Sequence, residues 1–375
     1  MVSNKEIRTV LFLGPILGSY RTQYLLKYFK DNPIFSVFYV DDNFFTRKSN
    51  SFFNRLVGAL IRSLTQLLYL LFADLIVVPA MTHKNLIWYK LAVFLKKNIL
   101  VDFYISMYDT YVLDRETVSL ESKEALAFKE RDFYLMKSGN PTIFLNYTEL
   151  KYYAKIADCA REQINYKIVP LCIEPRDKGS LPYLNVLSDV PVICWWGSYI
   201  PLHGLEKIIE MASNLNDRGF KFKLFLFGNN DKLAAPYIEL IENKGLSSIV
   251  TVANDYTFAN GRLEEFLKNT CDLSLGSFGD SEKAKKVFIN KIGDSFAMSI
   301  PVLTMETDAL KELINIEQDI FISLNNPENM AQKVMEIFGD VEKTLQVANN
   351  GYEKYNSVFS PKQYYKHLNE IFNIV

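Results

Sequence analysis

Cysteine and histidine are scarce in this chain of 375 residues, which holds four cysteines and three histidines. The cysteines are far apart and form neither a Cys-x-x-Cys pair nor a Cys/His ligand pattern, and the histidines lie in no metal-binding motif. This sparse pattern argues against a structural zinc site and a disulfide framework. It is typical of reduced thiols in a cytoplasmic protein.

An excess of one charge is also lacking, because 42 Lys and Arg meet 43 Asp and Glu, for a formal net charge of −1. We therefore expect no nucleic-acid partner. No Gly-x-Gly-x-x-Gly follows a strand-type run with an acid about 20 residues later, which disfavours a dinucleotide-dependent oxidoreductase. The first eight residues are polar, lead straight into a strand-type run and lack the apolar core of a signal peptide.

The longest apolar segment, 52–78, is interrupted by Arg55, Arg62 and Gln66. Its uninterrupted part is shorter than the ~20 residues that a helix needs to span a bilayer. The pattern favours a buried helix followed by a strand at Leu75–Val78. A helix lying on a membrane surface is the alternative, and a true span is the least favoured interpretation.

Strand-type runs alternate with helical patterns along the whole chain, and the alternation restarts after a Pro- and Gly-containing linker at 174–190. Such alternation predicts the α/β class, with two doubly wound, Rossmann-like parallel sheets covered on both faces. Sheets of this kind bind ligands beyond the carboxyl ends of their strands. The expected strands are 9–13, 34–40, 75–78, 98–103, 142–145, 167–170, 192–196, 222–227, 249–252, 271–275, 301–304 and 319–322.

Four elements of the second half carry candidate ligand-binding groups. In 196–204, a predicted strand passes through Gly197 and Ser198 into a helix that starts near His203 and Gly204. Free backbone N–H groups and the helix dipole at such a start suit a diphosphate, although an ordinary structural turn has the same pattern. The second element ends the next strand with Gly228 and Asn229, and the third is the run 273–280.

The fourth element, 283–294, is rich in lysine and contains one acid at its end. Lysines beside a helix start can neutralise phosphates, and a carboxylate at Asp294 can accept two hydrogen bonds from a ribose diol. A solvated lysine-rich surface is the alternative for this run. Its candidate residues are Lys283, Lys286, Asn290, Lys291 and Asp294.

In order and spacing, the four elements resemble the nucleotide-sugar domain of GT-B glycosyltransferases, in particular family 4 of retaining enzymes, of the bacterial surface-polysaccharide type. Shared features are the strand ending in Gly197, the Pro-Leu-His-Gly loop 201–204, the Asn-Lys pair before Asp294 and the Pro-Val at 301–302. The resemblance covers the C-terminal half well and the N-terminal half loosely.

The resemblance implies a GT-B fold, in which two Rossmann-like domains face each other across a cleft. An acceptor-binding domain is expected at 1–182, a nucleotide-sugar-binding domain at 183–358, and a C-terminal helix at 359–375 that packs back on the N-terminal domain. The implied enzyme is a cytoplasmic hexosyltransferase, with the inner face of the cell membrane as an open alternative location. It moves a sugar with retention, from a donor that we expect to be UDP-linked, to a glycan or polyprenyl-linked acceptor of surface polysaccharide synthesis.

Two other functions stay open: a nucleotide-sugar epimerase of the same fold, and a non-catalytic protein that binds sugar nucleotides. No metal or other cofactor is expected, because no Asp-x-Asp ends a strand in the donor half. Peripheral membrane contact through the apolar segment 52–72 would suit a lipid-linked acceptor.

The chain departs from the family at two pairs of positions. Ser198 and His203 stand where the family has the Arg and Lys that bind the diphosphate, and Lys286 stands at the first of two family glutamates. We expect Asp294, at the second glutamate, to bind the ribose. The lost charge is expected to be restored by lysines, so that diphosphate and sugar are bound by Gly197, Ser198, His203, Gly204, Lys283, Lys286, Asn290 and Lys291, and the nucleoside also by Gly228 and Asn229.

In the first half, the loop after the first strand offers Gly18 and Arg21, which the resemblance assigns to the donor; an ordinary β-α turn is the alternative. The family commonly has a His near the end of the strand 98–103, where this chain has Asp102 and, beyond it, Asp109. A carboxylate can stabilise an oxocarbenium-like centre or deprotonate the acceptor hydroxyl, so both are catalytic candidates, although each could merely cap a loop. Acceptor candidates are Tyr104 and Tyr108.

Overall fold

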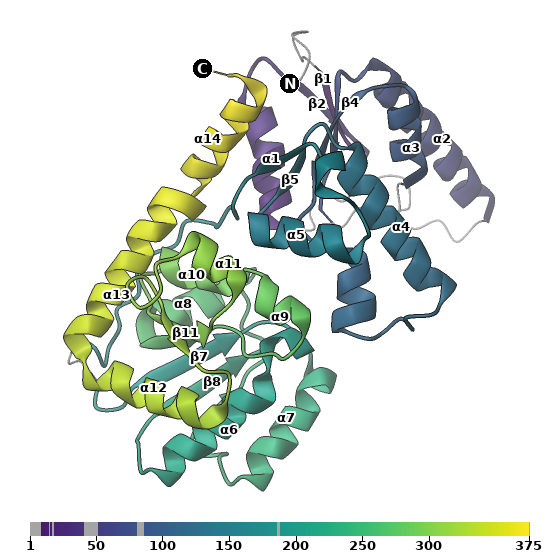
Figure 1. The fold of residues 1–375 in the computed structure, drawn as a ribbon. Helices are drawn as coiled ribbons and strands as arrows, with labels where there is room; N and C mark the ends of the chain where they lie inside the picture. Colours follow the sequence, from purple (N-terminus) through teal and green to yellow (C-terminus); the bar gives the residue numbers. More distant parts are fainter. Residues whose placement is uncertain are drawn as a thin grey trace. The chain divides into compact units, whose positions relative to one another are not determined.

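The computed structural model describes residues 9–14, 16, 19–40, 52–80, 86–185 and 188–374, with the backbone alone for 52–56. The chain forms two compact units, one of Met1–Cys172 with Tyr364–Val375 and one of Ile173–Gln363 (Figure 1). The boundary expected at 182/183 falls inside the second unit. The reason is that the linker packs there: Gly179 N–H donates to Met298 O (2.7 Å), and Ser180 N–H donates to Lys268 O (2.7 Å).

The first unit is built on a six-stranded sheet in the order β2-β1-β3-β4-β5-β6, and all its pairings are parallel. Apolar strands such as β3, which is buried along its whole length, are what a parallel sheet covered on both faces requires. The strands are β1 (Thr9–Phe12), β2 (Ser36–Tyr39), β3 (Leu75–Val78), β4 (Asn98–Asp102), β5 (Thr142–Phe144) and β6 (Tyr166–Ile168).

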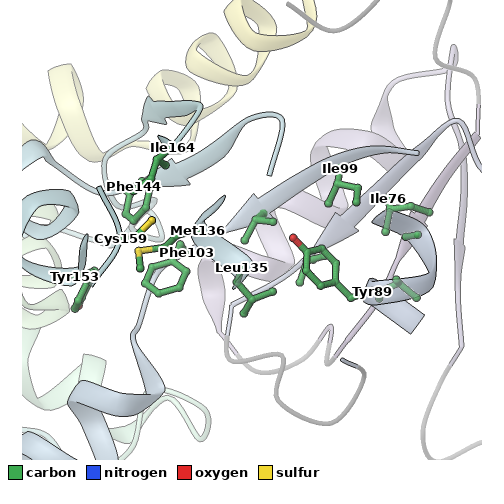
Figure 2. Close-up of a cluster of buried hydrophobic side chains, with 14 of the residues drawn as sticks. Ile76, Tyr89, Ile99, Phe103, Leu135, Met136, Phe144, Tyr153, Cys159 and Ile164 are labelled. Atoms are coloured by element: carbon green, nitrogen blue, oxygen red, sulfur yellow. The ribbon is translucent and has the colours of Figure 1, made fainter. Parts of the chain in front are cut away.

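Two hydrophobic cores lie on opposite faces of this sheet, because successive strand side chains alternate between faces. Leu11 belongs to the core under α2–α5, which Figure 2 shows with Ile76, Ile99, Phe103 and Phe144 among its members. Val10 and Phe12 belong to the other core, under α1 and α14. The helices and short turns are α1 (Tyr20–Asp31), α2 (Phe52–Phe72), α3 (Leu86–Phe94), η1 (Asp109–Asp114), α4 (Lys123–Ser138), α5 (Tyr147–Ile156), η2 (Arg161–Gln163) and α14 (Pro361–Phe372).

The second unit contains another six-stranded parallel sheet, in the order β12-β11-β10-β7-β8-β9. The chain runs outward from β7 to β9 and then returns to form β10 on the other side of β7. The strand order therefore reverses between β7 and β10, and such a switch point is where open α/β sheets bind ligands. The strands are β7 (Val192–Trp196), β8 (Lys223–Phe227), β9 (Val250–Val252), β10 (Leu273–Leu275), β11 (Val302–Met305) and β12 (Phe321–Ser323).

Helices cover both faces of this sheet as well, which confirms the predicted α/β class for both units (Figure 1). Eight described helices begin at a side chain that accepts a backbone hydrogen bond, whereas α6, α8 and α10 begin without one. The helices and turns are η3 (Pro201–His203), α6 (Leu205–Asp217), α7 (Asp231–Asn243), α8 (Arg262–Thr270), α9 (Glu282–Lys286), α10 (Asn290–Ala297), α11 (Asp308–Leu313), α12 (Pro327–Gly339), α13 (Val341–Lys354) and η4 (Tyr355–Phe359).

Candidate functional site

A buried lysine occupies the switch point of the second sheet. Lys291, in the first turn of α10, is only 5% exposed. Its Nζ donates to Gly276 O (3.3 Å), lies 3.5 Å from His203 Nδ1 and sits 4.3 Å from the centre of the Trp195 ring. Gly276 directly follows β10, His203 precedes α6 and Trp195 lies on β7. The ammonium of Lys291 therefore lies at the carboxyl ends of the two central strands, β7 and β10.

Gly197, directly after β7, leaves the space in front of this lysine open. Its φ of +150° favours glycine, and a Cβ there would lie 3.2 Å from His203 Nε2 and 3.4 Å from Lys291 Nζ. Three residues that the sequence pointed to, Gly197, His203 and Lys291, are thus in one place.

The charge of Lys291 is not neutralised within its own unit. Among the residues that the structure describes, its polar partners are a carbonyl and an imidazole, and no carboxylate pairs with it. Burial lowers the pKa of Lys291 well below its ordinary value. Burial and the neighbouring Lys291 also lower the pKa of His203 well below its ordinary value, so this imidazole is neutral at pH 7.

Backbone donors converge on the same place. The first-turn N–H groups of α10 and α6 have no side-chain cap, because the residues at the N-cap positions are Ile289 and Gly204. Uncapped N–H groups at the positive end of a helix dipole attract anions. A buried ammonium between two such helix starts can bind a diphosphate and supply the charge that the group needs.

The loop before α6 is held against the loop after β10 by backbone contact. Phe278 N–H donates to His203 O (3.1 Å), and Gly279 N–H donates to Leu202 O (3.2 Å). Gly204 has a φ of +58°, and a Cβ there would collide with the Phe278 carbonyl. Glycine at 204 therefore permits the close approach that places His203 beside Lys291.

Ser198, Gly228 and Asn229 lie together at the ends of β7 and β8. Asn229 Nδ2 donates to Ser198 Oγ (3.3 Å) at the surface. The ring of Tyr199 covers Gly228, where any Cβ would collide with it. Tyr199 Oη in turn donates to Asn254 Oδ1 (2.6 Å), which fixes the ring.

Asp294 lies one turn further along α10 than Lys291 and is engaged by an arginine that the sequence did not point to. Arg176 donates from Nε to Asp294 Oδ1 (3.2 Å) and from Nη1 to Glu264 Oε2 (2.7 Å), and its guanidinium stacks 3.7 Å from the centre of the Phe258 ring. Burial, partly offset by Arg176, raises the pKa of Asp294 to about 6. Arg176 lies in the linker 174–190, where no sequence motif indicates a binding residue.

The other lysines of the run 283–294 are placed differently from Lys291. Lys286 pairs with Asp308 at the start of α11, and Lys283 is buried within α9. Asn290 is exposed at the first position of α10. Among these lysines, Lys291 is the one that lies against Gly197.

In the first unit, Arg21 and Asp102 are paired with each other. Arg21 Nε donates to both carboxylate oxygens (2.8 and 3.0 Å), and its Nη1 donates to the carbonyls of Val169 and Pro170. Both side chains are almost fully buried. Burial alone disfavours the guanidinium charge, but Asp102 beside it raises the pKa of Arg21 above its ordinary value. The pair ties α1 to the ends of β4 and β6. Gly18 lies outside the described residues.

Asp109 is fully buried beyond β4, where Tyr152 Oη donates to its Oδ1 (2.5 Å). Its backbone N–H donates to Ser106 Oγ (3.0 Å), and that hydroxyl donates to Asp132 Oδ2 (2.6 Å). The half-buried Tyr108 joins the same network, because its N–H donates to Asp132 Oδ2 (3.0 Å). Asp109 is therefore the first residue of η1 and part of a buried polar network.

Another buried acid, Glu149, shares the neighbour Tyr153 with Asp109 and was not anticipated. Burial, with Glu149 and Asp109 beside it, raises the pKa of Tyr153 well above its ordinary value. Tyr104, half-buried, is another neighbour of Tyr153. Glu149 Oε1 accepts from Asn146 Nδ2 (2.8 Å), and Asn146 caps α5. The Asn-x-x-Glu spacing of a capping box was the signal available for this pair.

No group of three or more His, Cys, Asp and Glu side chains in the described ranges is arranged to hold a metal ion. Within the same ranges, no helix combines the length and the apolar character that crossing a bilayer requires.

Comparison with known proteins gives a fold and no family. No family model and no curated protein matches the chain. Among solved structures, a sucrose-phosphate synthase from Thermosynechococcus elongatus superposes with a TM-score of 0.71 at 11% identity, covering 98% of each chain. HepE from Anabaena, in complex with UDP-glucose, gives 0.69 at 14% identity, covering 98% of this chain and 100% of that one. A glycosyltransferase from Rickettsia africae ESF-5 gives 0.65 at 14% identity, covering 98% of both chains.

These neighbours are GT-B glycosyltransferases, and the coverage spans both units of the chain. The fold is therefore the two-domain α/β GT-B fold, as the sequence predicted.

Proposed function

We propose that this protein is a glycosyltransferase that takes a sugar from a nucleotide-diphosphate donor. The observation that carries the proposal is Lys291, a buried ammonium without a carboxylate partner in the described part of the chain, between two uncapped helix starts. Keeping an unpaired charge buried costs several kcal/mol unless a ligand supplies the opposite charge. The GT-B fold supports the same conclusion, and HepE, with UDP-glucose bound in its structure, shares that fold.

The diphosphate is assigned to the space in front of Gly197. Lys291 and the first-turn N–H groups of α10 contact its oxygens, and His203, as a neutral imidazole, donates a hydrogen bond to one of them. Ser198, Gly204 and Asn290 are assigned to the same diphosphate and sugar site. Lys283 and Lys286 add positive potential on α9.

The ribose is assigned to Asp294. Arg176 contacts its Oδ1, and in the described part of the chain no hydrogen bond to Oδ2 is found, so this oxygen can accept from a ribose hydroxyl. Gly228 and Asn229, at the end of β8, are proposed to border the nucleoside. UDP is the proposed donor nucleotide, on the sequence resemblance and on the ligand of HepE.

In the transfer step, the bond between the anomeric carbon and the donor phosphate oxygen breaks, and the nucleoside diphosphate leaves with the electron pair. Lys291 and the α10 dipole stabilise the charge that develops on this leaving group. The acceptor hydroxyl forms the new bond to the anomeric carbon and transfers its proton to a carboxylate. We assign Asp109, supported by Tyr152, as this carboxylate, with Tyr104 and Tyr108 as acceptor contacts. Arg21 and Asp102 are assigned a positioning role, because the two side chains form a buried ion pair with each other.

The acceptor is proposed to be a glycan or a polyprenyl-linked saccharide of surface polysaccharide synthesis, transferred with retention, on the sequence resemblance alone. NMR of the product's anomeric proton distinguishes retention from inversion.

A single assay tests the function. The full chain is incubated with UDP- and GDP-sugars, with and without saccharide and polyprenyl-linked acceptors, and nucleotide release is measured. Release that depends on the acceptor supports transfer. Conversion of one sugar nucleotide into another without acceptor indicates an epimerase, and tight binding with neither reaction indicates a binding protein. Failure of every nucleotide to bind removes the proposal altogether.

A further inference from the structure

Seven large apolar side chains are exposed on α2 over the part whose side chains are described, and Ser63 is the one exposed polar residue among them. The apolar side chains recur at helical spacings of three and four residues, so they line one face of the helix. Phe72, at 75% exposed, is the most open of them. This face consists of Val57, Leu60, Ile61, Leu64, Leu68, Leu71 and Phe72.

The opposite face of α2 packs on the protein and is the more polar of the two. Leu70 is fully buried in the core, but Gln66 is also buried, at 7% exposed, and Arg62 is half-buried on the same side. A helix that borders water normally shows the reverse arrangement, with its apolar stripe inward. The exposed apolar side of α2 is therefore suited to an apolar environment and not to water.

The neighbouring helix α3 also exposes large apolar side chains. Ile87 and Phe94, seven residues apart and so on one side of α3, are 74% and 80% exposed. Both helices cover the same face of the first sheet, because Leu70 of α2 and Tyr89 of α3 belong to one core (Figure 1). Together, Ile87, Phe94 and the seven residues of α2 make up what we call the α2–α3 face.

Basic residues greatly outnumber acids in the sequence around α2 and α3, in a chain whose net charge is −1. From 43 to 100, the sequence contains eight Lys and Arg and a single acid, Asp74, which accepts from Thr9 N–H (3.0 Å). Lys90 and Lys96 are exposed on and just after α3. Lys97 Nζ donates to the carbonyls of Leu71 and Ala73, at the end of α2 (2.7 and 2.9 Å).

An apolar helix face beside basic residues matches the chemistry of one surface: acyl chains next to anionic headgroups. An apolar protein partner would fit the leucines but gives no reason for the near-absence of acids. Since no described helix can cross a bilayer, the fitting arrangement is a helix pair that lies in the membrane interface.

We propose that the α2–α3 face binds the surface of an anionic lipid bilayer. The leucines and phenylalanines enter the headgroup boundary, and Lys90 and Lys96 contact lipid phosphates. None of these residues belongs to the proposed nucleotide site, so the inference goes beyond the transferase proposal and does not depend on it.

The test is flotation of the full chain with vesicles of phosphatidylcholine, with or without phosphatidylglycerol. Wild type is expected to float with the anionic vesicles, less so at high salt, and weakly with phosphatidylcholine alone. Leu64→Gln/Leu68→Gln is expected to weaken binding by at least about tenfold, since burying one leucine changes an equilibrium constant by about that factor. The matched control, Leu120→Gln/Leu126→Gln, alters two exposed leucines of the same unit away from the face and is expected to float like wild type.

Three results would overturn the proposal. Wild type fails to float with the anionic vesicles, or the two double variants float equally well. Alternatively, sedimentation without lipid shows a dimer that Leu64→Gln/Leu68→Gln dissolves, which would make the face an interface between two copies. Circular dichroism and UDP titration of each variant establish that it is folded. Loss of lipid binding with retained UDP affinity separates this face from the nucleotide site.

Discussion

Replacing Lys291 by Met is expected to separate stability from ligand binding. Methionine is close to lysine in length and packs adaptably, so the space between Trp195, His203 and Gly276 stays filled while the charge is removed. If Lys291 stabilises the fold, its replacement should lower the stability of the free protein. If Lys291 serves to bind an anion, its replacement should weaken ligand binding and leave the stability of the free protein unchanged.

The magnitudes follow from the contacts of Lys291. Burying an ammonium costs several kcal/mol. One hydrogen bond to Gly276 O offsets about 1.5–3 kcal/mol of this, and the contact with the Trp195 ring about 2 kcal/mol. The free variant should therefore match wild type or exceed it by about 1–2 kcal/mol, a Tm rise of about 2–4 °C per kcal/mol. Leaving a buried diphosphate charge unpaired should raise the Kd for UDP about 30- to 1,000-fold, or about 2–4 kcal/mol.

Thermal melts and calorimetric titration with UDP measure the two quantities, with Lys285→Met as the control. Lys285 is exposed on α9 and pairs with Glu282, so its loss should change neither quantity appreciably. The reasoning is refuted if Lys291→Met lowers the Tm by several degrees while UDP binds as tightly as to wild type.

Other substitutions test the remaining parts of the site. Affinity for a UDP-sugar, whose diphosphate does not titrate near neutral pH, should fall as pH drops through about 6, because a ribose diol binds the ionised form of Asp294, and titration of Asp294→Asn should lack this acidic limb. The affinity should also fall at high pH, since diphosphate binding favours protonated Lys291 and the pKa of the free lysine is lowered; Lys291→Met should lose that alkaline limb. Asp102→Asn leaves Arg21 buried without its counter-ion and should cost about 3–5 kcal/mol in urea unfolding, and a loss below about 1 kcal/mol would contradict the buried pair. Gly204→Ala forces a side chain against the Phe278 carbonyl, so it should weaken UDP binding and lower the Tm, while Gly219→Ala, with open space around it, should leave UDP binding unchanged.

The strand positions and the fold class were predictable because parallel strands covered on both faces appear as short, continuous apolar runs. The runs 75–78 and 192–196 coincide with β3 and β7. The helical pattern of 289–298 predicts a helix, which is α10. Short helices such as α9 and α11, with five and six residues, are too short to show a helical period. The polar helical pattern of 118–137 predicts another helix, and α4 begins only at Lys123, where the Ser122 hydroxyl accepts from Ala125 N–H.

Part of the site was predictable for a related reason. Gly197, His203 and Lys291 follow or precede elements whose ends meet at a switch point, so their proximity is a consequence of topology. The ion pairs were not predictable. Arg176 lies 118 residues from Asp294, and Arg21 lies 81 residues from Asp102. Nothing in composition or spacing specifies which buried carboxylate a given arginine will neutralise.

A crystal structure of the protein with a UDP-sugar would show directly where the diphosphate binds. We expect its oxygens within hydrogen-bond distance of Lys291 Nζ and of the first N–H groups of α10, in front of Gly197, with a ribose hydroxyl on Asp294. A diphosphate bound elsewhere in the second unit, with Lys291 still in contact only with Gly276, His203 and Trp195, would contradict this expectation.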